Sequence, residues 1–407
     1  MEFTAADIRF LATERAQAAV EEFSNAGADE WEVARALLKT PFDARERAVL
    51  AEAARLLPRL RRKLGTDAYA LGDELALAQS SARDVAGYKA SLLAGADGRI
   101  LDLCCGLGGD TLRLDPAAEV EGVDLSEARL AMFAHNHSRM RNGAAARLAD
   151  VRGVDVSGAF VLVDPDRRDP SDKSRNWNPA SLSPSLEETR ALAARARGAL
   201  VKLPPGGAVD CFGDGVQAEF LGRRRECCEL LVRAGALAER PGFVRAVHVD
   251  SGESVGAELA EARRAAGEVE LGAPEGFLCE PSPALLRSGL DRWMARGLGL
   301  RMADRDVAYF FSDRPVLGPF WDCFPLVDRS PISAGKMKRM LDARGIGMPV
   351  VKKRGIRTDI DREIAKLGRR REGAPGVLLL ARFGGEPVAL LAGPALKPEE
   401  EGDVRNA

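Results

Sequence analysis

Residues 100–112 read ILDLCCGLGGDTL, a short apolar run followed by a cluster of glycines. The run ILDL is compact and apolar, which predicts a strand buried on both faces. Glycines directly after such a strand let the backbone turn sharply and approach a ligand closely. Two kinds of nucleotide site begin in this way, one built for a pyrophosphate and one for a ligand without phosphate.

The residues of this loop distinguish the two kinds of site. A dinucleotide site follows the pattern G-x-G-x-x-G, which Gly106 and Gly108 fit, but Thr111 stands at the third position. Asp102, inside the predicted strand, would also repel a pyrophosphate. S-adenosylmethionine carries a sulfonium and an ammonium instead of phosphates, so an acid suits its methionine end. The loop therefore favours S-adenosylmethionine over a dinucleotide.

Three further acids stand where later strands are expected to end. Asp124 closes EVEGVD, Asp150 closes AARLAD and Asp164 closes AFVLVD. The carboxyl ends of parallel strands meet at one edge of a sheet, where such folds bind ligands. We expect Asp124 to accept the ribose hydroxyls and Asp150 to reach the adenine amino group. The predicted cofactor-binding residues are Asp102, Leu103, Cys104, Gly106, Gly108, Asp110, Thr111, Asp124, Leu125, Asp150 and Val151.

The rest of the chain falls into regions of different pattern. Residues 1 to 95 repeat alanine and leucine at helical spacing. From about 98 to 235, short β runs alternate with Ala-rich helical runs, which predicts a doubly wound α/β layout. The end of that region, AEFLGRRRECCELLVRAG (218–235), predicts two antiparallel strands. Residues 243–259 and 376–393 each predict a hairpin, the second with a Gly-Gly turn.

The composition excludes several classes of protein. The 407 residues carry a net charge of −2 and contain no apolar run near the roughly 20 residues that cross a bilayer. The N-terminus matches neither a signal peptide nor a transit peptide. Seven cysteines without a C-x-x-C pair, and only three histidines, argue against a metal site and for reduced thiols. We therefore expect a cytoplasmic protein with no metal and no membrane segment.

Positive charge is concentrated in one region, residues 331–371, which we call the basic window. It holds thirteen lysines and arginines and four acids, a net +9 in a chain of −2. A local field of this size can recruit a polyanion such as RNA. The alternative is an ordinary solvated charged face. Within the window, Lys352, Lys353 and Arg354 are the predicted substrate-binding residues.

The exit of the fourth predicted strand carries the candidate chemistry. It reads VDPDRR (163–168) and begins like the Asp/Asn-Pro-Pro-aromatic motif with which amino-group methyltransferases hold an amine. Asp164 and Pro165 fit that motif, whereas Asp166 and Arg167 replace its second proline and its aromatic ring. Trp177, further along the same loop, could stack on a base or simply anchor the loop.

The predicted catalytic residues are Asp164, Pro165, Arg167 and Lys202, while Arg168 and Trp177 are predicted to bind substrate. The cationic members could bind a phosphate or orient a carbonyl group. Arg167 and Arg168 could equally be partners in loop salt bridges. Lys202 interrupts an apolar strand at its carboxyl end, which favours a functional role.

The arginine in this loop resembles one in uridine-carbon methyltransferases, which also need a nucleophilic cysteine. Cys211 is the candidate by position, although nothing around it in the sequence resembles an activating site. Cys104 and Cys105 are predicted to be small packing residues that line the cofactor.

DLCCGLGGDT (102–111) resembles the first motif of class I S-adenosylmethionine-dependent methyltransferases, closest to the form in the trimethylguanosine synthase group. The whole chain resembles a bacterial family of these enzymes with a THUMP-like C-terminal domain. The stretches that carry this resemblance are LAQSSARDVAGYKA (77–90), VKLPPG (201–206), EPSPALLRSG (280–289) and VVKKRG (350–355). The resemblance implies a Rossmann-like catalytic domain, then a ferredoxin-like domain and an RNA-binding THUMP-like one. It also implies that the helix of Gln79 covers the cofactor.

The predicted fold class is therefore α/β, with a Rossmann-like methyltransferase domain between a helical N-terminal domain and α+β C-terminal domains. The predicted domains are helical (1–95), S-adenosylmethionine-binding (96–240), ferredoxin-like (241–330) and THUMP-like (331–396), with a disordered tail (397–407). The predicted function is S-adenosylmethionine-dependent methylation of a base in RNA. Two alternatives stay open: a methyltransferase for a small molecule or protein, and an RNA-binding protein that keeps the cofactor fold without turnover.

Overall fold

The computed structural model describes residues 1–26, 30–141, 143–167, 181–207, 209–223, 225–356, 360–368 and 372–397. The chain divides into two compact units. Unit 1 comprises Met1–Glu219 and Glu229–Gly242, and unit 2 comprises Phe220–Cys228 and Phe243–Ala407. In the described part of the chain, no helix is long and apolar enough to cross a membrane. The predicted domain boundaries stay predictions, and nearly all of the predicted tail lies outside the described residues.

The first 95 residues are helical, as their spacing predicts. The helices are α1 (Ala5–Leu11), α2 (Glu14–Asn25), α3 (Glu30–Leu37), α4 (Ala44–Leu64), α5 (Glu74–Gln79) and α6 (Arg83–Leu92). Asp43 starts the longest of them with a capping box, and Gly65 ends it in a left-handed conformation. Their buried core includes Leu107 and Leu112 of the glycine-rich loop. The helices therefore support that loop through a shared core.

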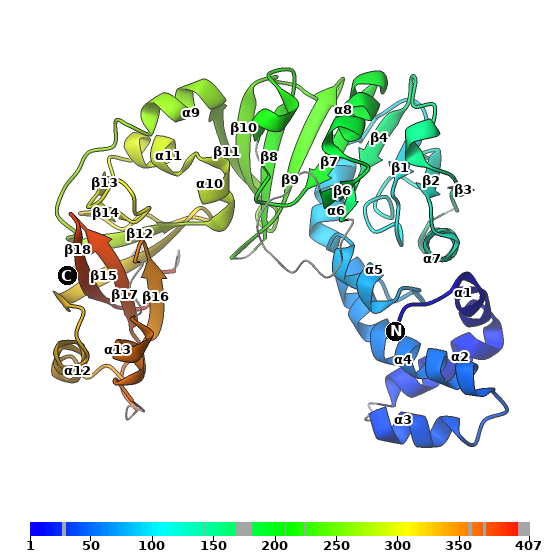
Figure 1. Ribbon diagram of the computed structural model, residues 1–407, viewed down its shortest axis with the longest axis horizontal. Helices are drawn as coiled ribbons and strands as arrows, with labels where there is room; N and C mark the ends of the chain where they lie inside the picture. Colours follow the sequence, from blue (N-terminus) through cyan, green and yellow to red (C-terminus); the bar gives the residue numbers. More distant parts are fainter. Residues whose placement is uncertain are drawn as a thin grey trace. The chain divides into compact units, whose positions relative to one another are not determined.

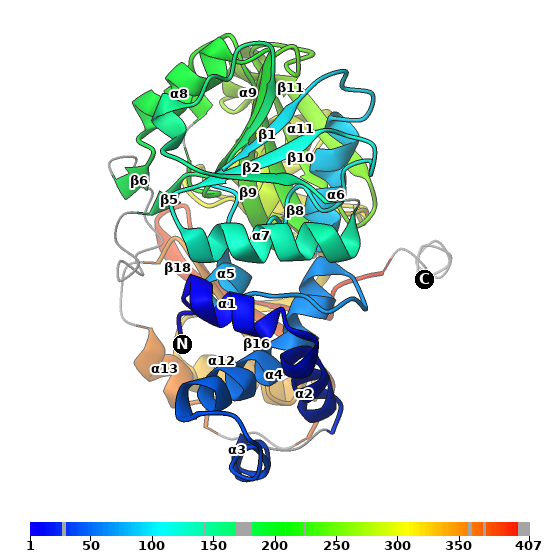
Figure 2. The same cartoon turned by 90° about the vertical axis from the view of Figure 1, so that its right-hand side faces the viewer.

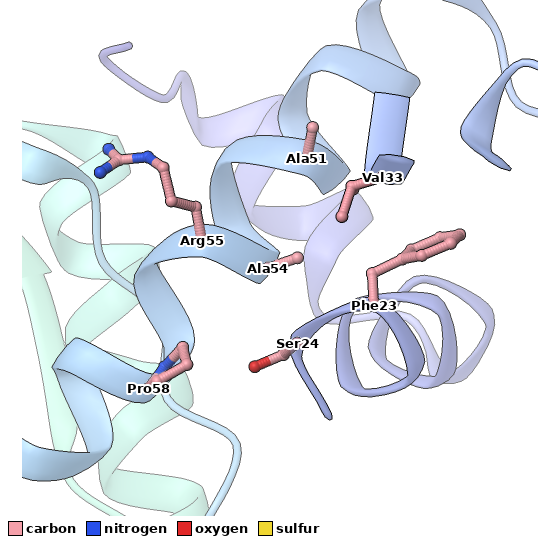
Figure 3. A pocket seen from close by; sticks show the side chains of 7 residues that line it. All are labelled: Phe23, Ser24, Val33, Ala51, Ala54, Arg55 and Pro58. Carbon is pink, nitrogen blue, oxygen red and sulfur yellow. The ribbon is translucent and has the colours of Figure 1, made fainter. Parts of the chain in front are cut away.

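An apolar cavity of about 270 Å³ lies among α2, α3 and α4 (Figure 3). Its lining residues are Phe23, Ser24, Val33, Ala51, Ala54, Arg55 and Pro58. The guanidinium of Arg55 pairs with Glu52 of its own helix and with Glu74 of α5, and it points away from the other lining residues. The cavity therefore offers apolar surface but no unpaired charge.

A doubly wound sheet forms the centre of unit 1 (Figure 1). Its parallel strands are β1 (Ile100–Leu103), β2 (Val120–Asp124), β3 (Ala145–Leu148), β4 (Phe160–Val163) and β7 (Gly198–Leu203). The run ILDL is buried at every position, because neighbouring elements cover both faces. All five strands confirm the β runs predicted from the sequence.

The prediction of a strand pair at 218–235 is also confirmed. The strands are β8 (Gln217–Arg223) and β9 (Glu226–Gly235), and β9 runs antiparallel to β7. The order in this part of the sheet is β8-β9-β7-β4-β1-β2-β3. Because the order reverses between β1 and β4, their carboxyl ends open a crevice at the point where such sheets bind ligands.

Two helices and several short elements complete this region. Helix α7 (Glu127–Met140) packs on β2 and β3, and α1 packs on α7 (Figure 2). Helix α8 (Leu186–Arg195) packs on β7. The short strands β5 (Asp166–Arg167) and β6 (Leu182–Ser183) pair beyond the end of β4, and the 3-10 turns are η1 (Val151–Gly153) and η3 (Val209–Phe212).

Unit 2 contains the two predicted hairpins. Strands β10 (Phe243–His248) and β11 (Glu253–Glu258) form the first, and β17 (Val377–Phe383) and β18 (Glu386–Ala392) form the second. Gly384 and Gly385 both have positive φ, the backbone conformation that a two-residue hairpin turn requires. Both hairpin predictions are confirmed.

The second hairpin belongs to a seven-stranded sheet of the described residues, with the order β13-β14-β12-β15-β18-β17-β16. The other strands are β12 (Phe277–Pro281), β13 (Arg301–Met302), β14 (Phe310–Ser312), β15 (Trp321–Pro331) and β16 (Val350–Arg354). The helices of this unit are α9 (Leu259–Ala265), α10 (Pro283–Ser288), α11 (Asp291–Gly297), α12 (Ala334–Ala343) and α13 (Asp361–Ala365). Strand β15 pairs with β12 and with β18, so the regions predicted as ferredoxin-like and THUMP-like share this sheet.

Candidate active site

The cofactor loop, residues 104–111, leaves β1 through a series of left-handed backbone positions. Cys104, Gly106 and Gly108 have φ values of 62°, 56° and 87°. A Cβ added to Gly106 would meet no atom within 4 Å, whereas one on Gly108 would lie 2.5 Å from Cε1 of His137. The two glycines therefore serve different needs, because Gly108 lets α7 pack closely and Gly106 leaves open space above the loop.

Thr111, at the position of a third glycine, anchors the loop from below. Its hydroxyl donates to Oδ2 of Asp102 at 2.8 Å and lies 3.1 Å from Nε2 of His137. Asp102 is only 4% exposed, and burial together with the nearby Asp110 raises its pKa well above the usual range. Asp102 is thus an internal support of the loop, and its predicted place at the methionine end of the cofactor stays a prediction. Leu103 is fully buried beside it.

Asp124, at the end of β2, joins that strand to the loop. Its Oδ2 accepts from the amide of Gly106 at 3.1 Å, and its Oδ1 accepts from the amide of Ser126 at 2.9 Å. Burial raises the pKa of this carboxyl, and each oxygen keeps one lone pair beyond these bonds. The next residue, Leu125, is 67% exposed. An acceptor pair beside an open apolar side chain suits a ribose with its attached purine.

Asp150 lies beyond the next strand, where it begins the short turn η1. Its carboxylate forms a two-pronged ion pair with Arg152, which lowers its pKa to about 2. The Asp150 side chain is 38% exposed, and Val151 is buried. The predicted contact between Asp150 and adenine would therefore compete with the Arg152 guanidinium.

Five buried or half-buried charges form a cluster behind the loop, which we call the charge cluster: Lys89, Asp110, Asp164, Lys202 and Glu229. The Nζ of Lys89 lies 2.6 Å from Asp110 and 2.8 Å from Glu229, while the Nζ of Lys202 lies 2.6 Å from Asp164. The Lys89 side chain is only 2% exposed. The cluster links α6, the cofactor loop, β9, β7 and the end of β4.

The cluster sets the charge state of its acids. Burial alone would raise the pKa of Asp110, but the ammonium groups of Lys89 and Lys202 lower it to about 2. Asp110 is therefore held ionised in an ion pair. Burial raises the pKa of Asp164 despite the opposing effect of Lys202, which leaves this carboxyl easier to protonate.

The acceptor loop, described over residues 164–167, follows β4. Lys202 donates to Oδ2 of Asp164 and, at 3.1 Å, to the backbone carbonyl of Gln79. The side-chain amide of Gln79 donates to Oδ1 of Asp166 at 2.7 Å. Gln79, predicted to lie against the cofactor, thus bonds to Lys202 and to Asp166 in the loop after β4. Pro165 is buried between the two acids.

The other predicted residues of this loop are less defined. The backbone of Arg167 pairs in β5 with Leu182, while Arg168 and Trp177 lie outside the described residues. Lys89, Glu229 and Asp166 were not predicted as site residues. A lysine within the apolar helical run VAGYKASLL and a glutamate within the strand ECCELLV were the available signals, because buried charges require partners.

The cysteines do not supply an activated thiolate at this edge. All seven are free, and Cys105 is buried. Burial and the surrounding carboxylates, Asp124 first among them, raise the pKa of the Cys104 thiol. Burial likewise raises the pKa of Cys105. Cys211 is half-buried in η3.

The candidate RNA-binding residues Lys352, Lys353 and Arg354 lie on β16, where two carboxylates pair with the three cations. Lys352 and Arg354 both pair with Glu280, and their cationic groups also lie over the rings of Phe324 and Tyr309. Lys353 pairs with Asp361 at 2.5 Å. These three charges are therefore less available to a polyanion than the sequence suggests.

Five parallel strands with the antiparallel β9 beside β7, a glycine loop after β1 and an acid at the end of β2 together match the class I methyltransferase type of site. No protein-family model matches the chain. An uncharacterized S-adenosylmethionine-dependent methyltransferase of Mycobacterium tuberculosis, found in strains CDC 1551 and H37Rv, is 30% identical over 333 residues. The match covers 79% of this chain and 87% of that protein. The chain therefore belongs to the S-adenosylmethionine-dependent methyltransferases, and S-adenosylmethionine is its methyl donor.

A solved structure extends the fold comparison to nearly the whole chain. A methyltransferase candidate from Porphyromonas gingivalis W83 superposes with a TM-score of 0.72 at 19% identity. The superposition covers 98% of this chain and 100% of that one. This similarity supports the fold from the N-terminal helices to the last hairpin.

Proposed function

We propose that this enzyme methylates a nitrogen atom of an amino-bearing base in RNA. The observation that carries the proposal is the Asp164–Lys202 pair at the end of β4, directly followed by Pro165. A carboxylate at this position can accept an N–H of an amine and so orient its lone pair toward a methyl donor. The thiols of Cys104 and Cys105 have raised pKa values, so neither is suited to act as the nucleophile that carbon methylation of uridine needs.

Different residues would bind the methyl donor and the methyl acceptor. Bound S-adenosylmethionine supplies an electrophilic methyl group on a sulfonium. Asp124 would accept the ribose hydroxyls, Leu125 would cover the purine, and the open space above Gly106 leaves room for close approach. On the acceptor side, Lys202 orients Asp164. Transfer would break the S–CH3 bond of the sulfonium, leaving S-adenosylhomocysteine as the neutral thioether, and form one N–C bond. The nitrogen then loses one proton, which Asp164, with its raised pKa, is suited to accept.

RNA is the acceptor class that the charge distribution favours. Within the basic window, Lys336, Lys338 and Arg339 are exposed on α12. These three make no ion pair with another described residue, unlike the cations of β16. We further propose that residues 241–330 and 331–396 correspond to the ferredoxin-like and THUMP-like domains implied by the sequence resemblance. The free cysteines support a cytoplasmic location.

A second candidate acceptor is a small molecule or a protein. The observation that favours it is the pairing of Lys352 and Arg354 with Glu280, which removes part of the basic charge that RNA would need. The two acceptor classes predict different labelled products.

The test is methyl transfer in vitro with tritiated S-adenosylmethionine. RNA and protein fractions come from a strain that lacks the gene, so that the natural sites are unmodified. We expect label in RNA that is lost on nuclease digestion and is absent with Asp164→Asn. Label in protein or in small molecules alone would overturn the RNA proposal. No label in any fraction, together with normal cofactor binding, would point to the non-catalytic alternative.

A further inference from the structure

Gln79 is the last residue of α5, upstream of the cofactor loop in the sequence, yet its contacts reach the acceptor loop. Its side-chain Nε2 donates to Oδ1 of Asp166 at 2.7 Å, and its backbone oxygen accepts from Nζ of Lys202 at 3.1 Å. Lys202 in turn holds Asp164 at 2.6 Å. Gln79 is thus connected to both acids of the acceptor loop.

The residues after Gln79 contact the opposite side, the cofactor loop. The hydroxyl of Ser81 accepts from Lys89 at 3.0 Å, and Lys89 also holds Asp110. A Cβ on Gly109 would lie 3.2 Å from the Cβ of Ser80. The segment 79–81 therefore lies between the loop for the methyl donor and the loop for the methyl acceptor.

We propose that Gln79 is a positioning residue for the methyl acceptor. Gln79 holds the Asp166 carboxylate beside Asp164, so that both acids contact the base that accepts the methyl group. This inference rests on the proposed function. Gln79 and Asp166 are both exposed, so a substrate can reach them. The helical N-terminal region thereby contributes to substrate choice as well as to support of the sheet.

The two carboxylates, Asp164 and Asp166, also limit which bases can be the methyl acceptor. Two carboxylates accept hydrogen bonds and donate none while ionised. An amino-bearing base can donate both N–H groups of its amine, whereas uracil presents mainly carbonyl oxygens along its pairing edge. The geometry therefore selects adenine, cytosine or guanine against uracil. Gln79 adds one amide oxygen as a further acceptor.

The test separates effects on the methyl acceptor from effects on the methyl donor. It measures both RNA dependence and cofactor affinity for the same variants. Gln79→Met removes the amide but keeps the length of the side chain, and Gln79→Glu places a like charge against Asp166. Gln17→Met serves as the matched control, because it removes an amide that instead donates to the carbonyl of Ala12 and accepts from Arg139. For each full-length variant, calorimetry gives the Kd for S-adenosylmethionine. Tritium transfer to RNA from a strain lacking the gene gives kcat and the half-saturating RNA concentration.

We expect Gln79→Met to raise the half-saturating RNA concentration about threefold to tenfold, and Gln79→Glu to raise it more than about tenfold. The cofactor Kd should stay within about twofold, and the control should match the wild type. A changed RNA dependence beside an unchanged cofactor Kd would not follow from a purely structural role, because loss of support for the segment 79–81 would disturb both loops.

Two outcomes would overturn the inference alone, provided that the wild type labels RNA. These are a weakened cofactor Kd in the Gln79 variants and an unchanged RNA dependence. If the wild type labels no RNA, the proposed function fails, and the inference fails with it.

Discussion

Replacement of Asp124 tests where the enzyme holds its methyl donor. Asp124 accepts one backbone amide on each oxygen, at 3.1 and 2.9 Å, which fixes both lone pairs that remain for a ligand. Asp124→Ala removes these bonds together with those to the cofactor ribose. Asp124→Asn keeps one acceptor oxygen and removes the charge.

The expected loss follows from the bonds involved. A hydrogen bond to a charged group contributes about 1.5–3 kcal/mol, so two ribose hydroxyls are worth about 3–6 kcal/mol before compensation by water. At about 1.4 kcal/mol per tenfold change, Asp124→Ala should weaken S-adenosylmethionine binding at least about 100-fold. Asp124→Asn, which keeps one of the two acceptors, should weaken it about tenfold.

Isothermal calorimetry on the folded variants provides the measurement. Asp155→Ala is the control. The Asp155 carboxylate likewise accepts a hydrogen bond from the backbone amide two residues later, that of Ser157, at 3.0 Å. Asp155, however, lies before β4 in the chain and not at the carboxyl end of a strand. A folded Asp124→Ala protein whose Kd lies within about threefold of the wild type would refute this placement of the ribose.

The same carboxylate predicts a pH dependence. Burial raises the pKa of Asp124, and its ionised form is the one that accepts from both hydroxyls. Cofactor affinity should therefore be complete above this raised pKa and fall as the pH drops through it. Asp124→Asn should lack this pH dependence, and an equal dependence in both proteins would assign it to another group.

Three further predictions follow from the site and the basic window. Gly108→Ala should lower the free energy of unfolding by about 2–5 kcal/mol in denaturant titrations, because its Cβ would lie 2.5 Å from a buried ring. Gly106→Ala, with no atom within 4 Å, should cost only about 1 kcal/mol yet weaken cofactor binding, and equal losses of stability would contradict this. Lys202→Met should lower kcat about 10- to 100-fold and move the acidic limb of the pH–rate profile upward, and an unmoved limb would exclude its role. Replacing Lys336 and Lys338 with alanine should reduce the slope of log Kd for RNA against log salt by about 0.7 per lysine, and an unchanged slope would move the RNA surface elsewhere.

The elements of the fold could largely be predicted from the sequence, because their signals are local. Short β runs, the longer of them compact and apolar, marked the five parallel strands, and a charged turn between two apolar runs marked β8 and β9. Gly384 and Gly385 marked the last hairpin through their backbone freedom. The place of Asp124 could be predicted for the same reason, since an acid at the carboxyl end of a parallel strand lies at the edge of the sheet where ligands bind.

The partners within the site could not be predicted, because they come from distant parts of the chain. Lys89 meets Glu229 only when α6 packs behind β9, across 140 positions of sequence. Thr111 of the loop donates to Asp102 of β1, and the Asp102 side chain is buried beneath the loop. The sequence did not indicate this contact. Gln79 bonds to Asp166 of the acceptor loop, 87 residues later in the chain. Its position just before the cofactor loop in the sequence did not indicate this contact.

The most direct test of the central claim compares RNA from cells with and without the gene. Nucleosides from total and size-fractionated RNA are separated and quantified by mass spectrometry, with a complemented strain and an Asp164→Asn complement as controls. We predict that one N-methylated adenosine, cytidine or guanosine disappears without the gene and returns only with the wild-type protein. An unchanged set of methylated nucleosides in every fraction, or the loss of a carbon-methylated uridine instead, would contradict the proposed function.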